Sequence, residues 1–207
     1  MSITPPDAPP TPDAAAPPAD DRDRADMERL AAGQDAALND LMERHATPVF
    51  QFLCRLVGNE DDAGDLAQET FARVFRARER YRLGEKFSTW LFAIAANLAR
   101  NHFRWRSRHP AVSLETETGA TGQTLNQILP AAEPTPGEQA LVGERTAAVR
   151  AAVAGLPDDL REAIVLCEWE EFSVAEAAAV LESTPKAVES RLYRARRILR
   201  EQLKSWL

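Results

Sequence analysis

The sequence predicts an all-α protein of two small helical domains joined by a flexible linker, with a helix-turn-helix in the C-terminal domain. Ala, Leu, Arg and Glu, which favour helices, dominate the 207 residues, and glycine is scarce. No segment alternates apolar and polar residues as a half-buried strand would. Two stretches with helical periodicity flank a stretch rich in turn-forming residues, which indicates two domains and a connection between them.

The N-terminal part of the chain changes character near residue 25. Residues 1–24 consist mainly of Pro, Ala and Asp with almost no large apolar side chain, which predicts a disordered, acidic tail. A helical pattern then runs over residues 25–108, with interruptions near Gly33, Gly58 and Gly84. We therefore expect the first helical domain to begin after the tail.

A linker and a second helical domain follow. Residues 109–137 combine Pro and Gly with many Thr and Glu residues, a composition typical of a flexible connection. Helical periodicity resumes over residues 138–207. Because the linker has few apolar side chains, we expect each helical domain to bury its own core.

The second domain has clear helix-start signals. Ser173 and Glu176 have the spacing of a capping box and begin a short apolar helix that ends near Leu181. After a short turn, Thr184 is placed as an N-cap and Pro185 as the first residue of a longer basic helix. A short helix, a tight turn and a basic helix predict a helix-turn-helix.

The charge is unevenly distributed along the chain. The formal net charge is −7, which by itself argues against a nucleic-acid partner. However, residues 86–114 contain no acid and several arginines, and residues 186–204 carry five arginines against two glutamates. Local basic segments determine the attraction of phosphate, so both segments remain candidates for contacting DNA.

The last predicted helix is amphipathic. Val188, Leu192 and Ala195 form an apolar stripe that should pack inward. The opposite side carries cations, a hydroxyl and an aromatic ring: Lys186, Ser190, Tyr193, Arg194 and Arg197. Such a face can hold phosphates and reach base edges in a major groove. An isolated basic helix would more simply have a solvated face, but the preceding capped helix and turn favour DNA reading.

A second candidate strip lies on the helix predicted from Phe87 to about Arg108. Its members are Trp90, Asn97, Asn101, Arg104 and Arg108. Amides that pair with bases, arginines that bind phosphate and an aromatic ring suit single-stranded or melting DNA. The pattern is equally compatible with a core helix that has one wet edge, and Trp90 alone is more simply a core residue.

The helix predicted between Asp62 and Glu79 presents acids and arginines outward. Glu69 and Arg73 form an i,i+4 pair of the favourable order. Taken alone, these residues indicate a self-neutralised solvent face.

These segments together resemble a known family. Residues 62–71 read DAGDLAQETF, residues 87–101 read FSTWLFAIAANLARN, and the helix-turn-helix includes FSVAEAA at 172–178 and VESRLYRAR at 188–196. In this order they resemble the polymerase-binding helix, the −10 helix and the −35-reading helix-turn-helix of the extracytoplasmic-function sigma factors of bacterial RNA polymerase. The resemblance covers about residues 25–204.

The resemblance implies a role for each segment. Core-polymerase binding falls on Asp62, Asp65, Gln68 and Glu69. Contacts with the −10 element fall on Trp90, Asn97, Asn101, Arg104 and Arg108, and contacts with the −35 element on Lys186, Glu189, Ser190, Arg191, Tyr193, Arg194 and Arg197. Residues 80–86 match the loop that captures a flipped-out base. The partners implied are core RNA polymerase, promoter DNA and an anti-sigma factor, and the linker would thread the polymerase cleft.

The sequence departs from the family pattern at two positions. Glu189 stands where many members have Lys or Arg; a carboxylate can accept from cytosine N4 but repels phosphate, so the −35 sequence that is read is open. Glu182 lies in the turn of the helix-turn-helix, where Gly or a small residue is frequent. The N-terminal tail is additional to the shared core.

Two other functional classes are considered. A stand-alone helix-turn-helix regulator, with residues 25–108 as a sensor or dimerisation domain, would bind duplex DNA by itself and would need neither Asn97 nor Asn101. An enzyme has little support, because His45, His102 and His109 form no triad or metal pattern and no Gly-rich phosphate loop occurs. We expect no catalysis, no cofactor and no metal.

The chain carries no signal for export or membrane insertion. Its first residues lack basic and apolar stretches, and the longest apolar run, residues 89–99, is too short to cross a bilayer. A cytoplasmic protein is expected. Cys54 and Cys167 lie far apart in apolar runs, which indicates buried core thiols, with a redox sensor as the alternative.

Overall fold

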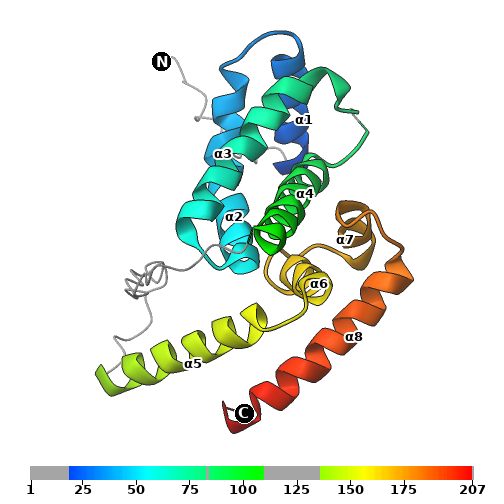
Figure 1. The fold of residues 1–207 in the computed structure, drawn as a ribbon. Helices are drawn as coiled ribbons and strands as arrows, with labels where there is room; N and C mark the ends of the chain where they lie inside the picture. Colours follow the sequence, from blue (N-terminus) through cyan, green and yellow to red (C-terminus); the bar gives the residue numbers. More distant parts are fainter. Residues whose placement is uncertain (1–18, 83, 110–135, 207) are drawn as a thin grey trace, which may run out of the picture.

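The computed structural model describes residues 19–82, 84–109 and 136–206, and this part of the chain is helical without strands (Figure 1). The first block contains α1 (Ala19–Ala31), α2 (Ala37–Val57), α3 (Glu60–Ala77), the short 3-10 helix η1 (Arg78–Arg80) and α4 (Phe87–Arg108). The second contains α5 (Pro136–Ala154), α6 (Asp158–Glu168), α7 (Val174–Val180), α8 (Pro185–Gln202) and η2 (Lys204–Trp206). The predicted all-α class is confirmed.

The helix boundaries follow from local chemistry. α2 ends where Gly58 takes the left-handed conformation (φ 73°), which glycine adopts without steric cost. The side chain of the next residue, Asn59, accepts a hydrogen bond from the backbone N–H of Asp62 and caps α3. This sharp corner places α3 antiparallel to α2 and presents the acidic start of α3 at the surface.

The helix-turn-helix forms as the spacing predicts. Ser173 and Glu176 make a reciprocal capping box at the start of α7, and the Thr184 side chain accepts from the N–H of Ala187 at the start of α8. In the turn between them Glu182 has φ 50°, a left-handed conformation that costs a non-glycine residue about 1 kcal/mol. The turn thus keeps the geometry that glycine would favour.

The predicted boundary of the tail at residue 24 is wrong. α1 begins at Ala19, and Asp23 is almost fully buried, with 1% of its surface exposed. Its carboxylate accepts from Arg44 Nε at 2.9 Å and lies 2.8 Å from His45 Nε2, while Asp26 pairs with Arg44 Nη2 at 2.5 Å. Acids that composition alone assigns to solvent are therefore neutralised by α2. Residues 1–18 of the expected tail lie outside the described residues.

The second block begins close to its predicted position. α5 starts at Pro136, near the expected end of the linker at residue 137, and the remaining linker residues, 110–135, lie outside the described part of the chain. None of the described helices is long and apolar enough to span a membrane.

The two blocks are packed against each other, contrary to the expectation of separate cores. α6 and α7 lie beside α2 and α4, and one buried apolar cluster extends through both blocks (Figure 1). At the junction the rings of Phe92 (α4) and Phe172 (the turn before α7) have centroids 5.0 Å apart. The Arg161 guanidinium donates to the carbonyl of Leu56 in α2 at 2.9 Å, and also to the carbonyls of Val153, Ala154 and Leu156 beside it. Local periodicity contains no information about such long-range packing.

The two cysteines are free and only partly buried, although both pack against the core as predicted. Burial raises the pKa of Cys54 to about 11 and also raises that of Cys167. Both thiols are therefore protonated near neutral pH, which lowers their reactivity.

Candidate nucleic-acid interface

The basic face of α8 is the first part of the interface. Val188, Leu192 and Ala195 are buried, as predicted, and this orients the helix. Six of the seven predicted −35 residues are exposed, and Tyr193 is 70% exposed. The exposed six are Lys186, Glu189, Ser190, Tyr193, Arg194 and Arg197. By helical spacing these six share one face, so the structure brings them together.

Arg191 differs from the others because it is half-buried at the edge of this face. Arg191 and Arg194 share one carboxylate, that of Asp159 in the first turn of α6. Oδ2 of Asp159 lies 3.7 Å from Nε of Arg191 and 3.7 Å from Nη2 of Arg194. The Asp159 and Arg194 side chains are about half exposed, so these ion pairs stabilise the fold little. Arg194 can therefore exchange the Asp159 carboxylate for a phosphate.

The predicted strip on α4 also forms. Asn97, Asn101, Arg104 and Arg108 are exposed, and Arg104 Nη1 donates to Asn101 Oδ1 at 3.4 Å. These residues face solvent from α4, which contains no acid. The alternative of a wet helix edge remains compatible with their exposure, and only their chemistry distinguishes the two interpretations.

Trp90 has a structural role as well as a partly exposed edge. Its ring lies 5.2 Å from Tyr81 and 6.2 Å from Phe87, centroid to centroid. The Tyr81 hydroxyl donates to the carbonyl of Glu85 at 2.5 Å, and burial raises the pKa of Tyr81. Tyr81 belongs to the segment 80–86, of which residue 83 lies outside the described residues, and its ring packs against those of Trp90 and Phe87. Trp90 therefore supports the segment that the resemblance assigns to base capture.

Trp105 is an exposed residue that was not predicted from the sequence. Its side chain is 59% exposed, and its ring stacks on that of His109 with centroids 5.0 Å apart and planes inclined by 23°. The available signal was its position among arginines in the acid-free segment. Periodicity cannot identify an exposed tryptophan, because most tryptophans are buried.

The acidic face of α3 lies apart from the two basic surfaces. Asp65 and Gln68 are exposed. Glu69 accepts from Arg73 Nε at 2.9 Å and Arg76 Nη2 at 2.8 Å, and the hydrogen bond from Arg73 is the main reason that its pKa lies below the usual value. Thus Asp65 and Gln68 are accessible, and Glu69 is held in a fixed position.

Asp62, the fourth predicted docking residue, faces α4. Its Oδ2 lies 3.4 Å from His102 Nε2 and 3.5 Å from Arg106 Nη1. The carboxylate thus joins the start of α3 to the C-terminal half of α4. Its side chain is still 36% exposed, so the same residue can contact a partner.

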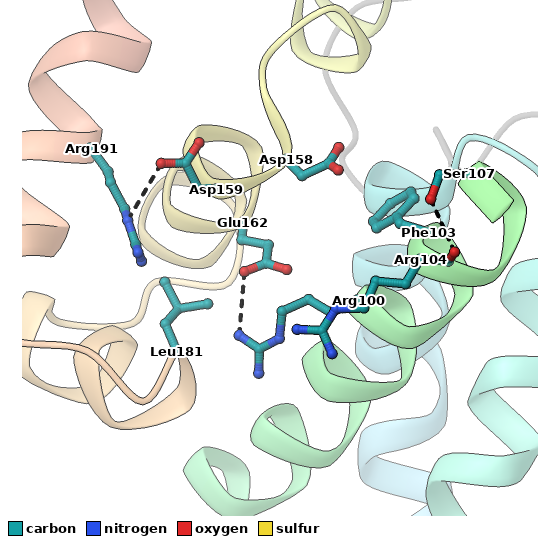
Figure 2. A pocket seen from close by; sticks show the side chains of 9 residues that line it. All are labelled: Arg100, Phe103, Arg104, Ser107, Asp158, Asp159, Glu162, Leu181 and Arg191. Carbon is teal, nitrogen blue, oxygen red and sulfur yellow. Dashed lines mark hydrogen bonds and ion pairs between the residues drawn. The ribbon is translucent and has the colours of Figure 1, made fainter.

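A cavity of about 350 Å³ lies between α4, α6 and α8 (Figure 2). On one side Arg100, Phe103 and Arg104 line it; on the other lie Asp159, Glu162 and Arg191, with Ser107, Asp158 and Leu181 completing the wall. Glu162 is 4% exposed, and its Oε2 lies 3.5 Å from Arg100 Nη1. Burial raises the pKa of Glu162 to about 7. The −10 strip and the −35 face therefore border the same small space.

Two further ion pairs cross between the blocks. Lys86, from the segment before α4, lies 3.0 Å from Glu176 of α7, and this bond raises the pKa of Lys86. Hydrogen bonds from Ser173 are the main cause of the low pKa of Glu176, about 2. Arg55 of α2 donates to Glu170 at 3.0 Å, and burial raises the pKa of Glu170 to about 7. In both pairs the first block supplies the cation and the second the carboxylate.

Within the described ranges, no three His, Cys, Asp or Glu side chains group as metal ligands would.

Comparison with known proteins agrees with this layout. Residues 41–109 match the family Sigma-70 region 2, and residues 146–199 match Sigma-70, region 4. The chain is 38% identical over 177 residues to the ECF RNA polymerase sigma factor SigE of Mycolicibacterium smegmatis, covering 84% of this chain and 65% of that protein. It is 32% identical to the RNA polymerase sigma-H factor of Pseudomonas aeruginosa, covering 90% of this chain and 96% of the relative.

Solved structures show the same fold. One is CnrH in complex with the cytosolic domain of CnrY, with a TM-score of 0.66 and 28% identity over 89% of this chain and 99% of that one. Another is the sigma factor RpoE in complex with the anti-sigma factor NepR from Bartonella quintana, with a TM-score of 0.61 and 26% identity over 80% of this chain and 96% of that one.

Proposed function

The chain belongs to the extracytoplasmic-function (ECF) sigma factors, and from this premise we propose that it binds core RNA polymerase, recognises −35 and −10 promoter elements and promotes strand opening for transcription initiation. The observation that carries the proposal is the pair of exposed basic surfaces, one on α4 and one on α8, each within a matched sigma region. A stand-alone regulator would need only the second.

The two surfaces suit different states of DNA. The α8 face combines arginines with a serine and a tyrosine on one helix that is fixed by a tight turn, which suits the major groove of the −35 duplex. The α4 strip combines two asparagines and two arginines with Trp90 at its N-terminal end, which suits unpaired bases of the −10 element. Residues 25–108 and 138–207 would then act as the −10 and −35 units, joined by the linker at 109–137.

The acidic face of α3 is proposed as the polymerase-docking surface. Asp65 and Gln68 are exposed and Glu69 is oriented by two arginines, so a basic surface on the polymerase could pair with all three. Asp62 would contribute at the edge, from its position against α4.

The described arrangement is not the one that occupies a promoter. Elements centred at −35 and −10 are about 25 base pairs apart, or about 85 Å at 3.4 Å per base pair. Here α4 and α8 line one cavity of about 350 Å³. The two blocks must therefore separate before both surfaces reach their DNA.

The protein would act by binding in the cytoplasm, where RNA polymerase works, without catalysis and without a cofactor. An anti-sigma factor is a proposed partner, because RpoE, a structure similar to this chain, was solved with one. Such a partner could stabilise the packed arrangement of the blocks.

Run-off transcription with purified core polymerase on a genomic promoter library tests the proposal. Transcripts that depend on the added chain are expected. Sequence-specific duplex binding without polymerase, and no chain-dependent transcripts, would instead support the stand-alone regulator.

A further inference from the structure

The indole of Trp105 is the most exposed of the four tryptophans. Trp105 is 59% exposed, compared with 37% for Trp169 and 38% for Trp206, while Trp90 is half-buried. It adds nothing to the apolar core, and the one ring stacked on it is that of His109, which is exposed as well. A flat apolar ring held at the surface is available for stacking by a partner.

The surroundings of Trp105 define the chemistry of that partner. It lies one helical turn after Asn101, at the border of the −10 strip, and its neighbours Arg104, Arg106 and Arg108 are exposed. No residue of α4 is acidic. The Asp62 carboxylate of α3, which lies 3.5 Å from Arg106 Nη1, is paired with that arginine. An aromatic face among arginines complements a nucleobase between phosphates.

The position along α4 indicates which base. α4 rises about 1.5 Å per residue, so Trp105 lies about 6 Å beyond Asn101 and about 12 Å beyond Asn97. The N-terminal end of α4 adjoins the base-capture segment, whereas its C-terminal end leads to the linker and the −35 block. Because the −35 element is upstream, the C-terminal end of α4 is the upstream end of the strip.

We propose that Trp105 is a stacking platform for the nucleobase at the upstream edge of the opened −10 segment, where single strands meet duplex. This assignment rests on the proposed function and deepens it. The arginines hold the flanking phosphates, and the indole covers the base face exposed when the neighbouring pair opens. His109 occupies the indole in the absence of DNA and is displaced by the base.

The test uses the full chain with core polymerase on a fork-junction promoter, which is duplex upstream and single-stranded over the −10 element. Trp105→Ala should weaken binding by about 5- to 140-fold, the range for losing one base–aromatic stack. Trp105→Phe should retain most of the affinity, because it keeps an aromatic face. Trp206→Ala, which removes another exposed indole from the far end of the second block, is the matched control and should bind as wild type.

Two further measurements identify the contact. The slope of affinity against salt should be unchanged in Trp105→Ala, since no charge is removed. The wild-type chain should bind more weakly to a fork-junction promoter that has an abasic site at the upstream edge. On this promoter the Trp105→Ala variant should bind no more weakly than the wild type. Additive losses on this promoter would overturn the assignment to that base.

The remaining outcomes separate this inference from the proposed function. If the wild type shows no polymerase-dependent binding to the fork-junction promoter, the proposed function and the stacking platform are both refuted. If the wild type binds and Trp105→Ala binds equally well, the stacking platform alone is refuted. Weaker binding of Trp105→Ala to core polymerase in the absence of DNA would also refute it, because the indole would then contact protein.

Discussion

Protonation of Glu170 should control whether the two blocks stay packed. Glu170 lies in the turn after α6, with 9% of its side chain exposed, and meets Arg55 of α2 across the junction. Burial raises its pKa from the ordinary 4.5 to about 7, whereas in separated blocks water would return it towards the ordinary value. Packing therefore takes up a proton between these two pH values.

The raised pKa of Glu170 determines the direction in which packing depends on pH. The packed arrangement binds more protons, so the contribution of Glu170 to packing is complete below about pH 4.5 and is lost as the pH rises through about 7. At about 1.4 kcal/mol per pH unit the full difference is about 3 kcal/mol, and part of the burial comes from its own block. We expect about 1–3 kcal/mol, or about 5- to 140-fold in the equilibrium constant between packed and separated blocks.

Glu170→Gln removes this titration while keeping the size of the side chain. The amide stays neutral, so at pH 8 the variant should be more packed than wild type. Dyes on cysteines introduced at the exposed Gln34 and Arg200, with Cys54 and Cys167 replaced by Ala, would report separation by energy transfer. Glu171→Gln makes the same charge change at an exposed site and should behave as wild type.

Glu162 contributes in the same pH range because its pKa is also about 7. Glu170→Gln should therefore reduce the pH dependence of energy transfer, and Glu162→Gln with Glu170→Gln should remove most of it. Constant transfer in the wild type between pH 5 and 8 would refute this reasoning. So would a Glu170→Gln variant that titrates like the wild type.

Four further predictions test the remaining assignments. Arg194→Ala should weaken −35 duplex binding with a salt slope shallower by about one ion, whereas Asn101→Ala should spare initial binding and reduce strand opening seen by permanganate; equal loss of initial binding in both would contradict the division of labour. Asp65→Arg with Glu69→Arg should abolish co-purification with core polymerase while the circular dichroism spectrum is kept, and wild-type yield would exclude docking there. Asp23→Ala should lower the free energy of unfolding in urea by about 3 kcal/mol, because Arg44 and His45 lose a buried partner, whereas Asp21→Ala at the surface should change it by less than about 1 kcal/mol. Glu182→Gly should leave stability equal or raise it by up to about 1 kcal/mol and Glu182→Val should lower it; a clear loss with Gly would argue against the left-handed turn.

The sequence predicts best what depends on neighbouring residues. The structure contains the predicted start of α4 at Phe87, its end at Arg108, the capping box at Ser173 and the Thr184 cap. Each of them results from short-range periodicity or from hydrogen bonds between residues three apart. The exposure of the α8 face follows in the same way from its apolar stripe.

The features that sequence analysis missed depend on contacts between distant residues. Asp23 appeared to belong to a solvated tail, and only its pairing with Arg44 and His45 on another helix makes its burial possible. No individual role was predicted for Arg100, but it forms an ion pair with Glu162 across the junction between the blocks. No role was predicted for Trp105, because its exposure depends on which elements pack against α4 and the neighbouring arginines are only an indirect signal.

The four hydrogen bonds of Arg161 determine how easily the junction can come apart on this side. Three of its acceptors, in Val153, Ala154 and Leu156, belong to its own block, and only the Leu56 carbonyl belongs to the other. Separation therefore breaks one hydrogen bond of the guanidinium and its contact with the Phe103 ring of α4, 5.7 Å from Cζ to the ring centroid. It releases one carbonyl near the C-terminal end of α2, where water can replace the lost donor. The three hydrogen bonds within the second block can stay in place, so the corner between α5 and α6 does not have to form again when the blocks come back together.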